Sequence, residues 1–221
     1  SSMINLPYEK KAHSNTTTHI GGLKVQLYNV QEVLEAAKQS KHEEFHLNVV
    51  YVLHPRGGDH HFSESIAYNI LDRYYKQKKD SQSPMICVAW DGPNHGSRII
   101  DETKNSSWNS GNDTHGVDMA SIIDSWVEEI KLVQDYLGAE LNIDYYLEPL
   151  SHQQREQREK DEQPRVVVHN LVTGYLLGGH TAIRFGSKYP SLVEVINHVV
   201  GCPDLTSLLV ARLLGNVLDS D

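Results

Sequence analysis

The segment Thr173-Gly174-Tyr175-Leu176-Leu177-Gly178-Gly179-His180 carries the strongest structural signal in this chain of 221 residues. It follows an apolar run, Arg165 to Val172, that predicts a strand, and it precedes a segment with helical spacing that extends to about Tyr189. Glycines stand two residues before and two residues after Leu176, and Gly179 adds further room. This spacing predicts a sharp strand-to-helix turn in which two backbones pass too closely for a Cβ atom.

Three further apolar runs predict strands around this turn. Leu47 to Leu53 and Met85 to Trp90 are continuous and rich in β-branched residues, as is typical of strands that are buried on both faces. Val193 to Val200 is the last strand that the sequence predicts. Strands that alternate with helical segments predict an α/β fold with a doubly wound, mainly parallel sheet. The expected helices are Val30 to Gln39, Ser65 to Tyr75 and Met119 to Leu137, the last with Ile122, Trp126, Ile130, Val133 and Leu137 on one stripe.

The remaining segments predict turns and surface structure. Thr16 to Tyr28 alternates around Gly21-Gly22 and predicts a hairpin. Asp101 to Gly116 is rich in Asn, Ser and Gly and predicts a loop. Ser151 to Gln163 has mixed charge and almost no apolar residues, so we expect a mobile surface insertion that trypsin cuts first. We expect residues 1–221 to form a single domain.

Three segments together resemble the α/β-hydrolase superfamily, in its esterase, lipase and peptidase branches. His54-Pro55-Arg56-Gly57-Gly58 is similar to the loop of His-Gly type that follows an early strand. Asp91-Gly92-Pro93-Asn94-His95-Gly96-Ser97-Arg98 is similar to that superfamily's D-x-R-x-H-G-x-S segment, and the turn at Leu176 to its nucleophile elbow. Order and spacing match from about Thr16 to Asp204. The resemblance implies an α/β-hydrolase-type sheet that is C-terminally incomplete, with the late strands absent.

The resemblance also implies roles for particular residues. In the superfamily an oxyanion is bound by the backbone N–H after the nucleophile and by a second N–H from the early loop. The first donor would be Leu177, and the second would be Arg56 or Gly57, because Pro55 has no N–H. Gly174, Gly178 and Gly179 would be the elbow glycines. His54, Asp91 and His95 would brace the loops by hydrogen bonding.

Two departures from the superfamily's pattern bear on catalysis. Leu176 stands where the elbow has Ser, Cys or Asp, so it offers no nucleophilic atom, and strain at that position costs about 1–3 kcal/mol. The superfamily's triad continues with an acid and then a histidine. After Leu176 the sequence holds only His180 and His198, which we expect on the elbow helix and inside a strand, and no histidine follows Asp204. We therefore expect a catalytically inactive chain, a pseudoenzyme.

Other interpretations use the same residues. The glycine-rich turn could bind phosphate at a helix N-terminus, which would make the chain a nucleotide- or flavin-binding domain, although the spacing of a P-loop or of G-x-G-x-x-G is absent. Asp59-His60-His61 and the segment Asp113 to Asp118 contain metal-ligand types, but loop residues of this kind mostly bind nothing. We expect no metal and no cofactor. Tyr74, Tyr75 and Trp126 are expected in the core.

Composition limits the partners and the compartment. The net charge of −9 argues against a nucleic-acid partner, and no apolar run approaches the roughly 18 residues of a membrane helix. Ser1-Ser2-Met3 does not begin a secretory leader. Cys87 and Cys202 stand in apolar surroundings and predict buried, reduced thiols, which favours a cytoplasmic protein.

Three functions compete on this evidence, and the nucleotide- or flavin-binding domain already described is the third. The first is a non-catalytic α/β-hydrolase-fold protein that acts by binding, with a small-molecule or acyl ligand as a candidate partner, or by scaffolding. The second is a serine hydrolase, of esterase or peptidase class, in an inactivated and shortened form. We also expect a homo-oligomer, formed through the edge of Val193 to Val200 or through the apolar segment Leu205 to Leu218.

Overall fold

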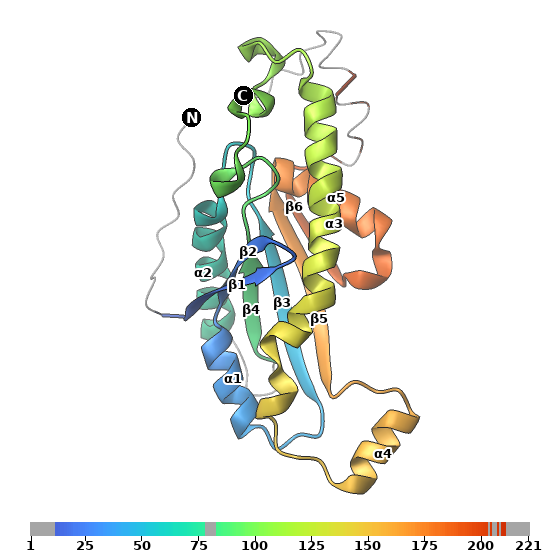
Figure 1. The fold of residues 1–221 in the computed structure, drawn as a ribbon. Coiled ribbons are helices and arrows are strands. Elements are labelled where there is room, and N and C mark those ends of the chain that lie inside the picture. The colour runs from blue at the N-terminus through green and yellow to red at the C-terminus, as the bar shows by residue number, and fades with distance from the viewer. Residues whose placement is uncertain (1–11, 78–82, 203, 205–206, 208, 211–221) are drawn as a thin grey trace.

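The computed structural model describes residues 12–77, 83–202, 204, 207, 209 and 210. Its centre is a six-stranded sheet with the strand order β1-β2-β4-β3-β5-β6 (Figure 1). The strands are β1 (Asn15–Ile20), β2 (Leu23–Tyr28), β3 (Phe45–Leu53), β4 (Met85–Ala89), β5 (Val166–Tyr175) and β6 (Val195–Val199). β4, β3, β5 and β6 are mutually parallel, whereas β2 pairs antiparallel with β1 and β4. The predicted mainly parallel α/β sheet is confirmed.

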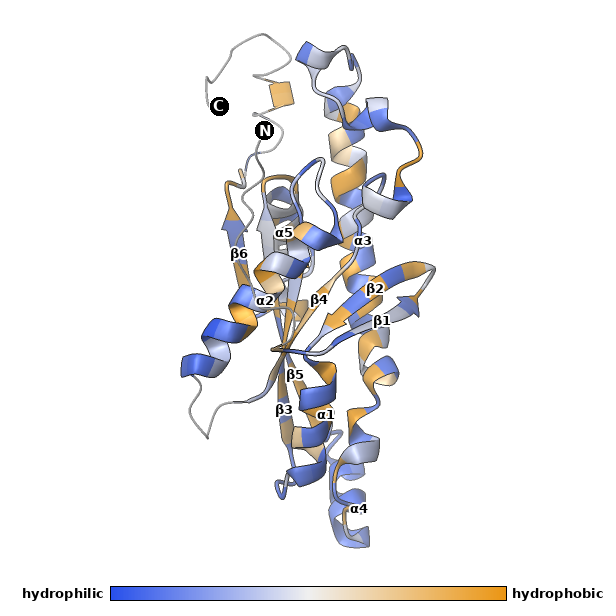
Figure 2. Ribbon diagram, turned by 90° about the vertical axis from the view of Figure 1, so that its left-hand side faces the viewer, coloured by the Kyte–Doolittle hydropathy of each residue, from blue (hydrophilic) through white to orange (hydrophobic). Residues whose placement is uncertain are grey.

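Helices cover both faces of this sheet. They are α1 (Val30–Gln39), α2 (His60–Gln77), α3 (His115–Leu141), α4 (His152–Lys160) and α5 (Leu177–Lys188). One buried cluster joins α1, α3 and α5 to one face, and a second cluster joins α2 to the other. Figures 1 and 2 show α4 at one end of the molecule, away from the elbow.

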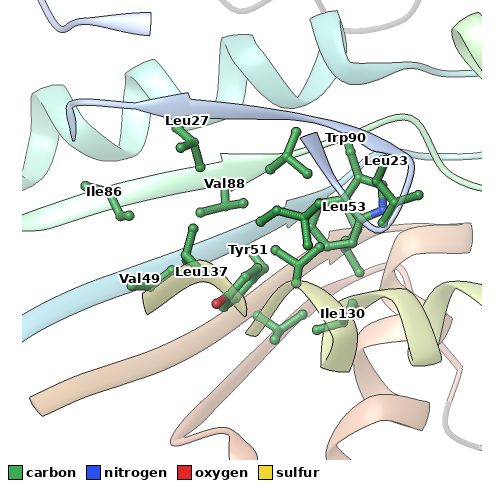
Figure 3. Packing of buried hydrophobic residues seen from close by; sticks show 14 of the residues in the cluster. Leu23, Leu27, Val49, Tyr51, Leu53, Ile86, Val88, Trp90, Ile130 and Leu137 are labelled. Atoms are coloured by element: carbon green, nitrogen blue, oxygen red, sulfur yellow. The ribbon is translucent and has the colours of Figure 1, made fainter. Parts of the chain in front are cut away.

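The alternation of side chains along β3 explains why its sequence is apolar throughout. Leu47, Val49 and Tyr51 point to the cluster with α3, where Ile130 and Leu137 pack against them (Figure 3). Val50 and Val52 point to the cluster with α2. Because both faces are covered, no position on this strand is left for a polar side chain in its second half.

The hairpin was predicted correctly. Asn15 pairs with Tyr28 and Ile20 with Leu23 across the turn. Gly21 and Gly22 have φ angles of 57° and 84°, as a two-residue turn with two left-handed positions requires. The antiparallel pair lies at the β1 edge of the sheet.

Three other expectations about local structure need correction. Ser151 to Gln163 contains helix α4, none of whose residues is buried. It forms because Ser151 accepts from the Gln154 amide while the Gln154 side chain accepts from the Ser151 amide, a capping box before residues with good helix propensity. Asp101 to Gly116 contains the 3-10 turns Glu102–Asn105 and Trp108–Ser110. Cys87 is buried as expected, but Cys202 is only partly buried.

The helix before the loop at residue 91 also begins earlier than predicted. α2 starts at His60, because the Asp59 carboxylate accepts hydrogen bonds from the amides of His61 and Phe62 at 2.9 and 3.4 Å. A pattern that resembled metal ligands is therefore the start of a helix. The expected apolar segment Leu205 to Leu218 lies largely outside the described residues. In the described part of the chain no helix is long and apolar enough to cross a bilayer.

Candidate functional site at the strand-to-helix elbow

Leu176 forms the turn between β5 and α5. Its backbone has φ 50° and ψ −108°, a combination that residues other than glycine rarely adopt. Its amide donates to the Val199 carbonyl at 2.9 Å, and its carbonyl accepts from the His180 amide at 2.9 Å. These two bonds fix the turn between β6 and the first turn of α5. The leucine side chain is 47% exposed, so it projects from the turn instead of filling the core.

The glycines of the turn stand where no side chain fits. A Cβ at Gly174 would lie 2.0 Å from the Gly178 carbonyl oxygen. A Cβ at Gly178 would lie 2.6 Å from the Leu53 carbonyl oxygen, at the end of β3. A Cβ at Gly179 would be 3.3 Å from Gly201, a closer approach than most real contacts but less severe. Strand β5, helix α5 and strand β3 therefore meet backbone to backbone at this point.

The loop after β3 lies beside the elbow. Leu53 pairs with Gly174 in the sheet, so the chain that leaves β3 begins next to the turn. The Gly58 amide donates to the Pro55 carbonyl at 2.9 Å, and Gly57 has φ 73°, which closes a tight turn with Arg56 and Gly57 at its centre. The Arg56 guanidinium donates to the Asn105 carbonyl at 2.6 Å. The structure thus brings Arg56 and Gly57 to the same end of the sheet as Leu177.

His54 links this loop to the loop after β4. Its Nε2 accepts from the Gly92 amide at 2.9 Å, so its Nδ1 carries the proton and donates to the Pro55 carbonyl at 2.8 Å. The ring is fully buried and lies 4.7 Å from the Trp126 ring, centre to centre. Burial lowers the pKa of His54 to about 4, so the imidazole is neutral at physiological pH.

Asp91 is the centre of a second set of hydrogen bonds. One carboxylate oxygen accepts from the amide and Nδ1 of His60 at 2.7 and 2.8 Å, and the other from the amide and hydroxyl of Ser97 at 2.8 and 2.6 Å. Burial would raise the pKa of Asp91, but the bonds from Ser97 and His60 outweigh it and hold the pKa well below its ordinary value. Gly96 has φ 53° and permits this contact, because a Cβ there would lie 2.4 Å from the Asp91 carboxyl carbon.

His95 is buried next to His54, with ring centres 5.2 Å apart. Its Nδ1 lies 2.8 Å from the Pro93 carbonyl oxygen, and its Nε2 has no hydrogen-bond partner among the described residues. Burial lowers the pKa of His95. The three residues expected to brace loops therefore come together behind the elbow, two of them as uncharged rings and one as a carboxylate.

These observations place the turn at Leu176 at the carboxyl end of β5. The sheet that contains β5 has the order β1-β2-β4-β3-β5-β6, and only β2 runs antiparallel to its neighbours. The early loop follows β3 beside that turn, as in the oxyanion arrangement of such sheets. The order of the strands and the positions of these two loops resemble those of α/β-hydrolase folds. No protein-family model and no curated protein matches the chain.

Solved structures show similar chain paths at low sequence identity. A cold-adapted esterase from an Arctic intertidal metagenomic library is 13% identical, with 94% of this chain and 72% of the esterase covered and a TM-score of 0.46. An S-formylglutathione hydrolase from Staphylococcus aureus is 14% identical, with coverages of 93% and 70% and a TM-score of 0.42. A peroxisomal α/β-hydrolase from Saccharomyces cerevisiae is 17% identical, and the chain spans 39% of its length, at a TM-score of 0.38.

The candidate catalytic residues after Leu176, which are His180, His198 and Asp204, make contacts other than those of a base and an acid beside the elbow. His180 is on α5, and its Nδ1 is 3.1 Å from the Cys202 amide and 3.0 Å from the Cys202 carbonyl oxygen. His198 is in β6, opposite Gly174. The Asp204 carboxylate is exposed and accepts from the Ser207 amide at 3.0 Å. Within the described residues no three His, Cys, Asp or Glu side chains are arranged to hold a metal ion.

Sequence reasoning missed the partners that hold the loop after β4. Arg98 donates to the backbone carbonyl of Asp91 at 2.7 Å and makes a two-point ion pair with Glu129 on α3, at 2.6 and 2.9 Å. The Trp90 indole also donates to Glu129, at 3.0 Å. Glu129 was not expected at the site because it belongs to a helix 31 residues further along the chain. Arg98 is the last residue of the motif that begins at Asp91, but no spacing in the sequence predicts that it pairs with Glu129.

Proposed function

We propose that this chain is a non-catalytic α/β-hydrolase-fold protein that binds a small acyl ligand at the elbow. The observation that carries the proposal is Leu176, a side chain of carbon and hydrogen alone at the position of the nucleophile. Acyl transfer through a covalent intermediate needs an oxygen, sulfur or carboxylate at this point. The groups that would bind the carbonyl oxygen do not depend on that side chain.

Two features support binding at the elbow without reaction. Leu177, Gly178 and Gly179 are the first residues of α5, and amides in a first helical turn have no acceptor within the helix. The helix dipole adds partial positive charge at the same end, so an acyl oxygen or a small carboxylate would be stabilised there. The half-exposed Leu176 side chain offers an apolar surface for the acyl chain.

The proposal is tested by activity and by binding together. We expect no hydrolysis of p-nitrophenyl butyrate above background and no labelling by a fluorophosphonate probe. In an NMR titration, butyrate should shift the amides of Leu177 and Gly178, and Leu176→Asp should abolish the shift because its carboxylate repels the ligand. Covalent labelling of any serine near the elbow would refute the non-catalytic assignment. Titration with butyrate that leaves these amides unmoved would refute the binding role.

A serine hydrolase in altered form is the second candidate. It is favoured by the strained backbone at Leu176. A positive φ at a leucine lowers the stability of the fold, and strain of this kind is typical of the nucleophile position of an active enzyme. The test is Leu176→Ser. We expect this variant to remain far below normal turnover, because a serine without a positioned base is a weak nucleophile. Near-normal turnover would show that a base lies within this chain, and His180 and His198 would be the first to examine.

A further inference from the structure

A cleft lies toward the opposite end of the sheet from the elbow. It has a volume of about 470 Å³ and lies between the C-terminal half of α3 and the first halves of β3 and β5. Figure 3 shows Val49, Tyr51 and Leu137 where these elements meet. β5 begins at this cleft with Val166 and ends at the elbow with Tyr175. Asn170 is the last residue of β5 that lines the cleft, so about five residues of strand, roughly 17 Å, separate the two sites.

The walls of the cleft are mainly apolar, but three buried polar atoms in its lining have no partner. The side-chain nitrogen and oxygen of Gln134 are both buried and make no hydrogen bond among the described residues. The Nε atom of Arg165 is also buried and also has no hydrogen-bond partner among the described residues. A buried polar group without a partner lowers the unfolding free energy by about 1–3 kcal/mol, so two such side chains beside one cleft destabilise the fold substantially.

The charges around the cleft are already matched. Arg165 uses its Nη1 toward Asp144, at 3.5 Å, and its Nη2 to donate to the Glu148 carbonyl. The Asp135 carboxylate pairs with Lys131 at 2.5 Å. An incoming anion or cation would therefore meet no unpaired opposite charge. The unfilled positions are two kinds of donor N–H and one acceptor oxygen, which require a neutral ligand able both to accept and to donate.

We propose that this cleft binds a small uncharged molecule that carries a carboxamide on an apolar body. The ligand's amide oxygen would accept from Gln134 or from the Arg165 Nε–H, and its N–H would donate to the Gln134 oxygen. The apolar body would lie against Leu47, Val49 and Leu137. A cleft of this size, apolar with a few polar groups that fix orientation, is typical of small-molecule sites.

The experiment is an NMR titration of the full chain with benzamide, benzoate and toluene. We expect benzamide to bind saturably and to shift the amides of Gln134 and Arg165. Benzoate should bind at least tenfold more weakly, because its carboxylate cannot donate to Gln134 and approaches Asp135 and Asp144. Toluene should also bind at least tenfold more weakly, because it leaves the polar groups unpaired. Equal or tighter binding of benzoate or toluene would overturn the assigned chemistry.

Two variants and one control complete the test. Gln134→Met keeps the length of the side chain and removes both unpartnered atoms, so it should weaken benzamide about tenfold or more and raise the melting temperature. Val168→Phe narrows the cleft from a wall position and should block benzamide as well. Gln153→Met, on the exposed helix α4, is the matched control and should change neither binding nor stability. Unchanged benzamide affinity in both Gln134→Met and Val168→Phe would refute the site.

Discussion

The strain at Leu176 can be measured by comparing two substitutions at that one position. Leu176→Ala and Leu176→Gly both remove the leucine side chain, but only glycine adopts φ 50° and ψ −108° without a steric penalty. At most positions in a helix or strand alanine is the more stable of the two by about 0.5–1 kcal/mol. We expect the reverse order at the elbow, with Leu176→Gly more stable than Leu176→Ala.

The magnitude follows from two opposed terms. The lost burial of the leucine cancels in the comparison, because both variants lack that side chain. Relief of a backbone strain of about 1–3 kcal/mol favours glycine. The greater freedom of glycine in the unfolded chain opposes it by about 0.5–1 kcal/mol. The difference in unfolding free energy should therefore be about 1 kcal/mol in favour of glycine, and no more than about 2.5 kcal/mol.

Urea unfolding followed by tryptophan fluorescence provides the assay, since Trp90 and Trp126 are buried and report on the core. With a typical slope of about 1–3 kcal/mol per molar urea, the expected difference separates the midpoints by about 0.3–1 M. Val117, 72% exposed in the first turn of α3, is the control site, and there alanine should be the more stable substitution. If Leu176→Ala were the more stable variant by about 0.5–1 kcal/mol, as at ordinary positions, the elbow would carry no strain and the strain assigned to Leu176 would be refuted.

Three further predictions concern the loops and the surface. Asp91→Asn should lower the unfolding free energy by about 3 kcal/mol at pH 7, since an amide has only one oxygen and cannot accept from both His60 and Ser97. Because the pKa of Asp91 is depressed in the folded state, the stability that its carboxylate provides is present above about pH 4 and is lost below it. Urea unfolding at pH 7 and pH 3 should therefore show the stability difference between wild type and variant shrinking at pH 3. The pKa of His54 lies at about 4, below its ordinary value of 6.5, so its contribution of roughly 3 kcal/mol is present above pH 6.5 and is lost as the pH falls toward 4; an NMR titration midpoint near 6.5 would contradict this. Limited trypsin digestion should cut first after Arg155, Arg158 or Lys160 in α4, none of whose residues is buried. A first cut after Arg165, at the start of β5, would contradict the assignment of α4 as surface structure.

The layered fold was predictable because the sheet leaves a strong pattern in the sequence. Leu47 to Leu53 has no polar interruption apart from Asn48, as a strand buried on both faces should, and β3 is such a strand. Helix α4 was missed because hydrophobic periodicity was the signal sought and α4 has no apolar residue. Ser151 and Gln154, three residues apart, were the available signal. β5 continues to Tyr175 because its pairing with β3 persists through Gly174, a residue that in sequence suggests a turn.

The site was predictable in its local parts and not in its long-range ones. The motif at residues 91–98 named Asp91 and His95, and the glycine spacing named the elbow. The partners of these residues come from helices that the motif does not contain: His60 opens α2, and Trp126 and Glu129 lie on α3. Their position beside the loops is set by how the two helices pack on opposite faces of the sheet, and no spacing in one sequence encodes that. His60 is instructive, because it was considered as a metal ligand and instead holds Asp91.

The open side of β6 predicts self-association. In the described part of the chain β6 pairs with β5 alone, so its other side presents backbone N–H and C=O groups without a neighbouring strand. Val195 is 48% exposed and Val200 73% exposed, which adds apolar surface at the same edge. Two copies related by a two-fold axis would bring their β6 strands together antiparallel, and each would complete the other's sheet.

We expect a homodimer at micromolar concentration in sedimentation equilibrium. Val195→Lys places a charge at the edge and should yield a monomer, because exposed lysine is a common means of preventing strand pairing. Val117→Lys, on the exposed surface of α3, is the matched control and should leave the dimer intact. A wild-type monomer of 25.0 kDa whose β6 amides are protected from exchange would refute the dimer. Protection in a monomer would require that another segment of the same chain covers the edge, since amides that remain open to water exchange freely.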